Sequence, residues 1–240
     1  MQIMEKLAKK AKANREEPPV TLAFFGDSVT QGCFELYKSG EDGHKTVHDK
    51  NSVYHAKIAQ IFSVLYPTVP INIINGGISG SGAKGSLGRL ERDVLKFQPD
   101  LTVVCFGLND SGRGVDGLQD YQDSLRTIFE RLKEAGSEVI FMTPNMMATG
   151  ISAHVTDPYF TTIAEDVCGR QNEGIMDLYV QAAKEVCEEK GVRVCDCYGK
   201  WKMLAAGGVD VTELLSNKIN HPTREMHWLF AYSLVETMMR

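Results

Sequence analysis

The sequence predicts an α/β domain built on a parallel sheet, and three observations carry that prediction. Short apolar runs typical of strands buried on both faces recur along the chain, the first over residues 20–25 (VTLAFF). Each run is separated from the next by a segment with helical apolar spacing. Strands that alternate with helices in this way form right-handed βαβ crossovers, which join parallel strands.

The elements are expected in a regular order along the chain. After the first strand, further strands are predicted at residues 71–75, 101–106, 138–143 and 192–195. Helices are predicted near residues 53–65, 87–97, 121–135 and 173–190, with Gly136 and Gly191 as C-terminal stops, and a last helix from about Pro222 to Met239. Two long stretches without such patterns, residues 33–51 and 145–172, are predicted to be functional loops or lids.

Length and composition favour one ordinary globular domain. Of the 240 residues, 43% are apolar and 24% are charged. A domain of this size buries roughly 70% of the surface of its unfolded chain. These values exclude a disordered chain, a collagen and a small disulfide-bonded protein. We therefore expect a single domain over residues 20–240, preceded by a charged leader, residues 1–19, that is predicted to be helical.

Charge and hydropathy restrict the partners and the compartment. Lys and Arg number 26 against 31 Asp and Glu, a net charge of −5, and no basic run marks a phosphate-binding face, so nucleic acid is not an expected partner. The apolar runs fall far short of the ~20 residues of a membrane span. The N-terminus does not resemble a secretory signal, so a cytoplasmic protein is expected. The lysines of the N-terminal segment are expected to face solvent or to contact a partner subunit, which leaves a homo-oligomer open.

The spacing of cysteine and histidine does not indicate a metal or redox site. The six cysteines are scattered, and the close pair Cys195 and Cys197 is spaced too tightly for a C-x-x-C arrangement. We interpret all six as reduced, mostly structural thiols. His44 and His48 have the i, i+4 spacing of a metal-binding pair, but their surroundings have a poor helical pattern, so no metal is expected.

A hydroxyl group that is a candidate nucleophile follows the first predicted strand. Ser28 stands between Gly26 and Gly32, at the carboxyl end of that strand, where open α/β sheets place their sites. For an isolated serine at such a position, capping of the following helix is the more frequent use. The residues that follow the other strands must therefore decide between the two interpretations.

A glycine-rich turn over residues 76–85 follows the second strand. Gly80, Gly82 and Gly85 match the dinucleotide pattern G-x-G-x-x-G, but Asp100, the acid at about the right distance, precedes its strand. The residues around Lys84 do not fit a Walker motif either. What remains is a turn of backbone N–H groups at a helix start, which can hold a phosphate or a developing oxyanion.

Two further polar residues stand at comparable places. Asn109 follows the third strand and offers a side-chain N–H₂ donor, although a turn or helix cap explains it equally well. His221 directly precedes Pro222, which is expected to fix the start of the last helix. A lone histidine is more often a surface or structural residue than a catalyst. Four such features occur in this order along the chain: Ser28, the glycine-rich turn, Asn109 and His221. Separate structural explanations for all four are less convincing than a shared site.

Together these residues resemble the motifs of the GDSL or SGNH hydrolase family of serine esterases and acylhydrolases. The similar blocks are Gly26-Asp27-Ser28, Asn75 to Gly80, Gly107 to Asp110, and His221 with Pro222, so the resemblance covers most of the chain. It implies Ser28 as the nucleophile, His221 as the base, and an oxyanion hole made by the N–H groups of Ser28 and Gly80 and the side chain of Asn109. It also implies a flavodoxin-like three-layer α/β/α sandwich, for which we expect a five-stranded parallel sheet in the order 2-1-3-4-5.

One departure from the family concerns the group that orients the histidine. The family usually has D-x-x-H, but Lys218 stands at the Asp position, and an ammonium group cannot accept a hydrogen bond from an imidazole N–H. We expect Lys218 to turn to solvent and the acceptor to be a backbone carbonyl or the side-chain oxygen of Asn217 or Asn220. Asn217 is preferred, because a one-residue insertion before His221 would bring it to the Asp position.

The resemblance implies a serine-dependent ester hydrolase that works through an acyl-enzyme and needs no cofactor. Short acyl groups are expected as substrates, with acetyl groups on carbohydrates as one candidate, because no extended apolar segment near the motifs suggests a lipid channel. Two alternatives stay open. One is a catalytically weak binding module that keeps the pocket, which Lys218 suggests, and the other is an acylhydrolase of the thioesterase or lysophospholipase type.

Overall fold

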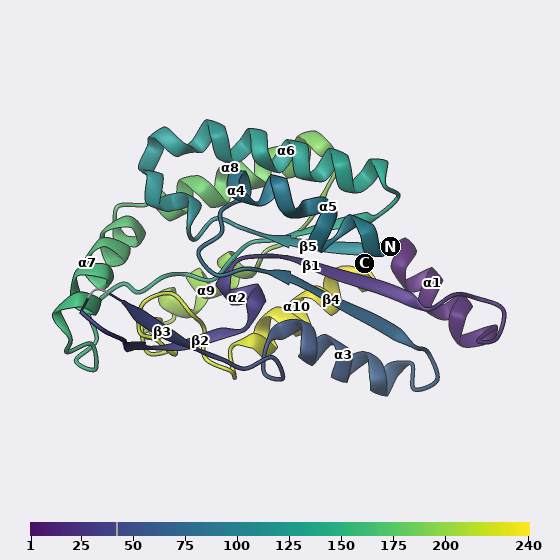
Figure 1. The fold of residues 1–240 in the computed structure, drawn as a ribbon, viewed down its shortest axis with the longest axis horizontal. Coiled ribbons are helices and arrows are strands. Elements are labelled where there is room, and N and C mark those ends of the chain that lie inside the picture. The colour runs from purple at the N-terminus through teal and green to yellow at the C-terminus, as the bar shows by residue number, and fades with distance from the viewer. Residues whose placement is uncertain (42) are drawn as a thin grey trace.

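The computed structural model describes residues 1–41 and 43–240 and has three layers, with helices on both faces of a central sheet (Figure 1). The sheet has five parallel strands in the order β4-β1-β5-β6-β7. Their bounds are Val20–Gly26 for β1, Ile71–Gly77 for β4, Leu101–Cys105 for β5, Glu138–Met142 for β6 and Arg193–Cys195 for β7. Counted over the five strands expected from the sequence, this is the order 2-1-3-4-5, so the predicted fold is confirmed.

The helices divide between the two faces of the sheet. One face carries α6 (Leu118–Glu134) and α8 (Ile175–Lys190), with the short α4 (Ala83–Ser86) and α5 (Leu90–Asp93) beside them (Figure 1). The other face carries α1 (Gln2–Lys12), α3 (Tyr54–Leu65), α9 (Cys197–Ala206) and α10 (His227–Met239). The helices α2 (Ser28–Gln31) and α7 (Pro158–Asn172) lie toward the end where the strands finish (Figure 1). That end of the sheet carries the candidate site.

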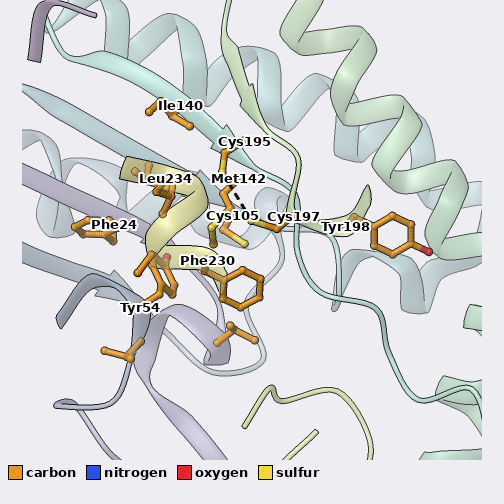
Figure 2. Close-up of a cluster of buried hydrophobic side chains, with 14 of the residues drawn as sticks. Phe24, Tyr54, Cys105, Ile140, Met142, Cys195, Cys197, Tyr198, Phe230 and Leu234 are labelled. Atoms are coloured by element: carbon orange, nitrogen blue, oxygen red, sulfur yellow. Dashed lines mark hydrogen bonds between the residues drawn. The ribbon is translucent and has the colours of Figure 1, made fainter. Parts of the chain in front are cut away.

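Alternate strand residues supply two separate apolar cores. Phe24 of β1 is fully buried in the core under α3 and α10, whereas its neighbour Phe25 is fully buried in the core under α6 and α8. Figure 2 shows the first core, in which Phe230 of α10 packs near Tyr54. The six cysteines are free and buried. Three of them, Cys105, Cys195 and Cys197, lie together in the core that Figure 2 shows, which agrees with a structural role.

The two stretches predicted to be irregular contain regular structure. Residues 33–51, of which residue 42 lies outside the described part, include an antiparallel hairpin of β2 (Cys33–Lys38) and β3 (His44–His48). Residues 145–172 include α7. The hairpin strands are mostly exposed or half-buried and therefore lack an apolar run. The start of α7 did carry a signal, because Asp157 caps the helix and Pro158 occupies its first position.

Two predicted helices differ from the structure. Residues 87–97 form α5 between two single 3₁₀ turns, η1 (Leu87–Arg89) and η2 (Leu95–Phe97), rather than one helix. The last helix begins at His227 and not near Pro222. Pro222 instead pairs with Leu215 in an isolated antiparallel bridge, so His221 sits in a loop. The predicted helices at residues 53–65, 121–135 and 173–190 match α3, α6 and α8 to within a few residues.

The N-terminal segment packs onto the sandwich through one face of α1. Ile3 and Leu7 are fully buried in the core on that side of the sheet. On the exposed side, Lys6 pairs with Asp100 at 2.7 Å and the side chain of Lys9 is 70% exposed. Across the described residues, the longest apolar helical segments are too short or too polar to cross a membrane.

Candidate active site

The side chains of Ser28 and His221 meet at the carboxyl end of β1. Ser28 Oγ lies 3.0 Å from His221 Nε2, and both residues are only 5% exposed. Ser28 is the first residue of α2, whose N-cap Asp27 accepts a hydrogen bond from the N–H of Val29 at 3.0 Å. This one-turn helix ends at Gly32, whose φ of +96° favours glycine. The structure therefore brings two of the predicted site residues into hydrogen-bond contact.

The other ring nitrogen of His221 faces a backbone carbonyl. Nδ1 lies 2.9 Å from the carbonyl oxygen of Phe34 in β2. Because a carbonyl oxygen only accepts, Nδ1 carries the proton, and the lone pair on Nε2 of the neutral ring faces the Ser28 hydroxyl. Burial lowers the pKa of His221 to about 4, although the hydrogen bond to Phe34 acts in the opposite direction. The ring is therefore neutral near pH 7 and can act as a base.

The preference for Asn217 as the acceptor for the imidazole is wrong. Its Oδ1 accepts the backbone N–H groups of Ile219, Asn220 and His221 at 3.0, 2.9 and 2.9 Å. Its Nδ2 donates to the side-chain oxygen of Asn220 at 3.0 Å. Asn217 thus organises the turn that carries His221, a frequent use of asparagine before a turn. The acceptor is the alternative that the sequence left open, a backbone carbonyl.

Lys218 turns away from His221 and binds Glu213. Its Nζ lies 2.8 Å from Glu213 Oε2 and 3.0 Å from the carbonyl oxygen of the same residue. The side chain is only 20% exposed, so it is held in an ion pair rather than extended into solvent as expected. The backbone of Lys218 has a φ of +57°, a left-handed conformation that is uncommon for residues other than glycine.

Gly80 and Asn109 line one cavity of about 380 Å³. Gly80 has a φ of +73° in the turn after β4, a conformation that favours glycine. The turn is tied to α2, because the N–H of Ser79 donates to Gln31 Oε1 at 2.7 Å. Asn109 Nδ2 donates to the carbonyl oxygen of Ser81 at 3.1 Å. Gly80 and Asn109, which come from different strand ends, therefore line a shared cavity, and the lining of this cavity does not include Ser28 or His221.

Two buried carboxyl groups are next to Ser28 and Asn109 in the sequence. Burial raises the pKa of Asp27 to about 7 and that of Asp110 to about 6. Asp110 Oδ1 accepts the N–H of Ala83 at 2.8 Å and so fixes the start of α4. Asp27 Oδ2 lies 3.5 Å from Asn109 Nδ2. A raised pKa lowers the negative charge of Asp27 at neutral pH, which reduces its repulsion of an oxyanion held nearby.

The histidine pair of the hairpin has another role in the structure. His44 Nδ1 lies 3.0 Å from the hydroxyl of Tyr159, so it joins the hairpin to the start of α7. His48 Nδ1 contacts the carbonyl oxygen of Thr46 at 3.1 Å. Among residues 1–41 and 43–240, no three His, Cys, Asp or Glu side chains gather in a way suited to a metal ion.

Comparisons with known proteins place the chain in a family. The family model described as "GDSL-like Lipase/Acylhydrolase family" matches residues 24–229, a range that includes Ser28, Gly80, Asn109 and His221. The chain belongs to this family. It is 28% identical over 177 residues to an acetylxylan esterase from Geobacillus stearothermophilus, which corresponds to 70% of this chain and 71% of the relative.

Two solved structures share the fold of this chain. A crystal structure of an acetylxylan esterase from Geobacillus stearothermophilus has a TM-score of 0.65 and 24% identity, and covers 91% of this chain and 94% of its own. An alpha/beta hydrolase enzyme from the metagenome of Lake Arreo, Spain, has a TM-score of 0.67 and 20% identity, with 92% and 95% covered. The family membership makes the chain an esterase or acylhydrolase.

Proposed function

We propose that this GDSL family member is a serine esterase that removes short acyl groups, acetyl groups above all, from carbohydrates. The observation that carries the proposal is the 3.0 Å contact between Ser28 Oγ and His221 Nε2, with Nδ1 bound to the Phe34 carbonyl. A hydroxyl beside a neutral imidazole in a fixed tautomer is activated as a nucleophile. The contact also argues against a binding module without catalytic ability.

The proposed reaction has two acyl-transfer steps. Ser28 Oγ attacks the ester carbonyl carbon while its proton passes to His221 Nε2. The imidazolium then returns this proton to the departing sugar oxygen, which leaves the acyl group as an ester of Ser28. In the second step His221 takes a proton from a water molecule whose oxygen attacks the acyl carbon. The free acid leaves, and Ser28 regains its proton from His221.

Three donors are proposed to hold the oxyanion. The N–H of Ser28 lies at the start of α2, where the helix itself supplies no acceptor. The N–H of Gly80 and one hydrogen of Asn109 Nδ2 complete the set. That hydrogen has only a 3.5 Å contact with Asp27, which is long for a hydrogen bond, so it is free to turn to the oxyanion. A single donor of this kind is worth ~10²-fold or more in rate.

The preference for short acyl groups and sugars rests on the surroundings of the site. The cavity at Gly80 and Asn109 is bordered by charged side chains such as Lys84 and Arg113, which suit a sugar rather than a fatty acyl chain. A second cavity of about 290 Å³ next to Asn217 combines polar residues with Phe160, a mixture that suits sugar hydroxyls and C–H faces. The relative named as an acetylxylan esterase supports the same substrate class.

The test compares ester hydrolysis by the chain and by Ser28→Ala. We expect release of acetate from a nitrophenyl ester and from acetylated xylo-oligosaccharides, with a loss of about 10³-fold or more in Ser28→Ala. Ser124→Ala is the matched control, because Ser124 is similarly buried (4% exposed) but belongs to α6. Equal rates for Ser28→Ala and the unchanged chain would refute the serine mechanism. Binding of the oligosaccharide without hydrolysis would identify a binding module instead.

A series of substrates tests the acyl and alcohol preferences. Acetate esters should be hydrolysed faster than esters of longer acids by the unchanged chain. A faster rate with a long-chain ester would refute the short-acyl proposal. A higher kcat/KM with an acyl thioester or a lysophospholipid than with the acetylated sugar would favour the other types of acylhydrolase.

A further inference from the structure

The acceptor for His221 lies in a part of the fold outside the central sheet. Phe34 and His221 are 187 residues apart in the sequence. The hairpin of β2 and β3 forms a separate two-stranded sheet and lies near α7, at the end where the central strands finish (Figure 1). The position of the Phe34 carbonyl therefore depends on the contacts that hold this hairpin against the loop of His221.

An irregularity in the hairpin releases the Phe34 carbonyl. Cys33 pairs with His48, and Leu36 pairs with Thr46, so two residues of β2 stand opposite one residue of β3 between these pairs. Such a bulge leaves a backbone group outside the strand ladder and turns it in a new direction. The Phe34 carbonyl is thereby directed to His221 Nδ1 instead of to the neighbouring strand.

Arg224 contacts the bulge from the loop that carries His221. Two nitrogens of its guanidinium donate to the two carboxylate oxygens of Glu35, one of them at 3.1 Å. Its Nε donates to Asp49 Oδ2 at 3.0 Å. The guanidinium carbon lies 4.3 Å from the centre of the Phe34 ring. A single side chain, three residues after His221, therefore holds the residue that supplies the acceptor and the residue next to it.

Asp49 connects the same arginine to the helix of the nucleophile. Asp49 Oδ1 accepts the N–H groups of Asn51 and Ser52 at 3.0 and 3.2 Å, and the Asp49 N–H donates to the carbonyl oxygen of Gly32 at 2.9 Å. Gly32 is the residue that ends α2, the helix that begins with Ser28. Arg224 thus joins three pieces: the His221 loop, the bulged hairpin and the end of the Ser28 helix.

We propose that Arg224 is a positioning residue that holds the Phe34 carbonyl against His221 Nδ1. The Phe34 carbonyl, held in place by Arg224, would thereby take over the orienting role of the aspartate in D-x-x-H. Arginine suits this role because its planar guanidinium binds one carboxylate with two N–H groups and keeps a third for another. The ammonium of a lysine cannot make this set of bonds. The inference rests on the proposed function, since it concerns how the base of that reaction is oriented.

The experiment compares Arg224→Met with a matched arginine on the other layer. Arg126 also binds two carboxylates, Asp123 at 2.7 Å and Glu189 at 2.8 Å, and its side chain is 28% exposed against 32% for Arg224. In Arg224→Met, kcat for an acetate ester should fall between about 10- and 100-fold while KM changes less than about twofold. Arg126→Met should keep its kcat. Arg224→Lys should recover little, and methylguanidinium should restore part of kcat to Arg224→Ala.

A second measurement does not depend on turnover. The Nδ1–H of His221 is buried and hydrogen-bonded, so it should give a downfield imidazole N–H resonance in the NMR spectrum of the unchanged chain and of Arg126→Met. That resonance should be lost or shifted in Arg224→Met. If the unchanged chain hydrolyses no ester, the proposed function fails, and this resonance still tests the position of the carbonyl. An unchanged resonance with full kcat in Arg224→Met would overturn the inference. So would an unchanged resonance with a kcat loss that merely follows the loss of folded protein.

Discussion

Replacing Asn217 by alanine removes one oxygen that accepts three backbone hydrogen bonds. Two of the donors belong to Ile219 and His221, which are 1% and 5% exposed, so water reaches them poorly. A buried donor left without a partner costs about 1–3 kcal/mol, so two of them cost about 2–6 kcal/mol before the turn relaxes. We therefore expect Asn217→Ala to lower the free energy of unfolding by about 3 kcal/mol.

The matched variant is Asn217→Asp, which keeps Oδ1 as an acceptor. It loses only the Nδ2 donor, which binds the side-chain oxygen of Asn220 at 3.0 Å. Its expected loss of stability is therefore about 1 kcal/mol. Because the same turn holds the backbone of His221, kcat should fall in Asn217→Ala and stay close to the original value in Asn217→Asp.

Urea unfolding measures the stabilities, and ester hydrolysis at a temperature where each variant is folded measures kcat. The comparison of midpoints is valid only if the slope with denaturant is unchanged. An unfolding free energy of Asn217→Ala within about 0.5 kcal/mol of the original would refute the reasoning, since surface substitutions have effects of that size. Stability lost with kcat retained would show that the turn is not needed to place His221.

Three further predictions concern the pH dependence of activity, the pH dependence of stability, and Lys218. Because burial lowers the pKa of His221 to about 4, the acid limb of the pH profile of kcat/KM should lie near pH 4 and not near the ordinary 6.5. An acid limb near pH 6.5 would mean that the ring is solvated. Burial also lowers the pKa of His55 to about 4 and that of His227 to about 3. The stability that these neutral rings contribute is therefore complete above about pH 6.5 and is lost as the pH falls toward 4. Chemical unfolding at several pH values measures this loss. Lys218→Ala should leave kcat within about twofold and cost at most about 1 kcal/mol, because Glu213, its partner in the ion pair, is half exposed. A tenfold loss of kcat in Lys218→Ala would assign this side chain a part in the site that the structure does not give it.

The sequence predicts the central sheet because its inner strands, β1, β5 and β6, are buried on both faces. All five residues of β5 are buried, and such strands appear in the sequence as unbroken apolar runs. The hairpin was missed for the opposite reason. Tyr37 is 50% exposed, Glu35 and Lys38 interrupt the apolar residues of β2, and β3 is mostly polar, so no unbroken apolar run marks the hairpin. The early start assigned to the last helix came from reading Pro222 as a first helical residue, whereas it lies in a bridge.

The sequence indicates those site residues whose chemistry requires a particular side chain. A nucleophile needs a hydroxyl and a base needs an imidazole, so Ser28 and His221 are recognisable by type and order. The group that orients the imidazole needs only an accepting oxygen, which every residue carries on its backbone. Nothing in the identity of Phe34 could reveal it, and the bulge that frees its carbonyl is a property of strand register.

A carbonyl in place of a carboxylate changes the proposed chemistry as well as the geometry. The Phe34 oxygen fixes the tautomer of His221 as an aspartate would, but it brings no negative charge to the imidazolium that forms in the reaction. Burial lowers the pKa of His221 to about 4, and the hydrogen bond to the Phe34 carbonyl offsets this effect only in part. A ring with a lower pKa is a weaker base toward Ser28 and a stronger acid toward the leaving group. Sugar alcohols are poor leaving groups that depart only with a proton. The stronger acid speeds this departure, which compensates in part for the slower attack by Ser28. In the proposed mechanism this balance favours esters of ordinary alcohols, which need the acid, over activated esters, which do not.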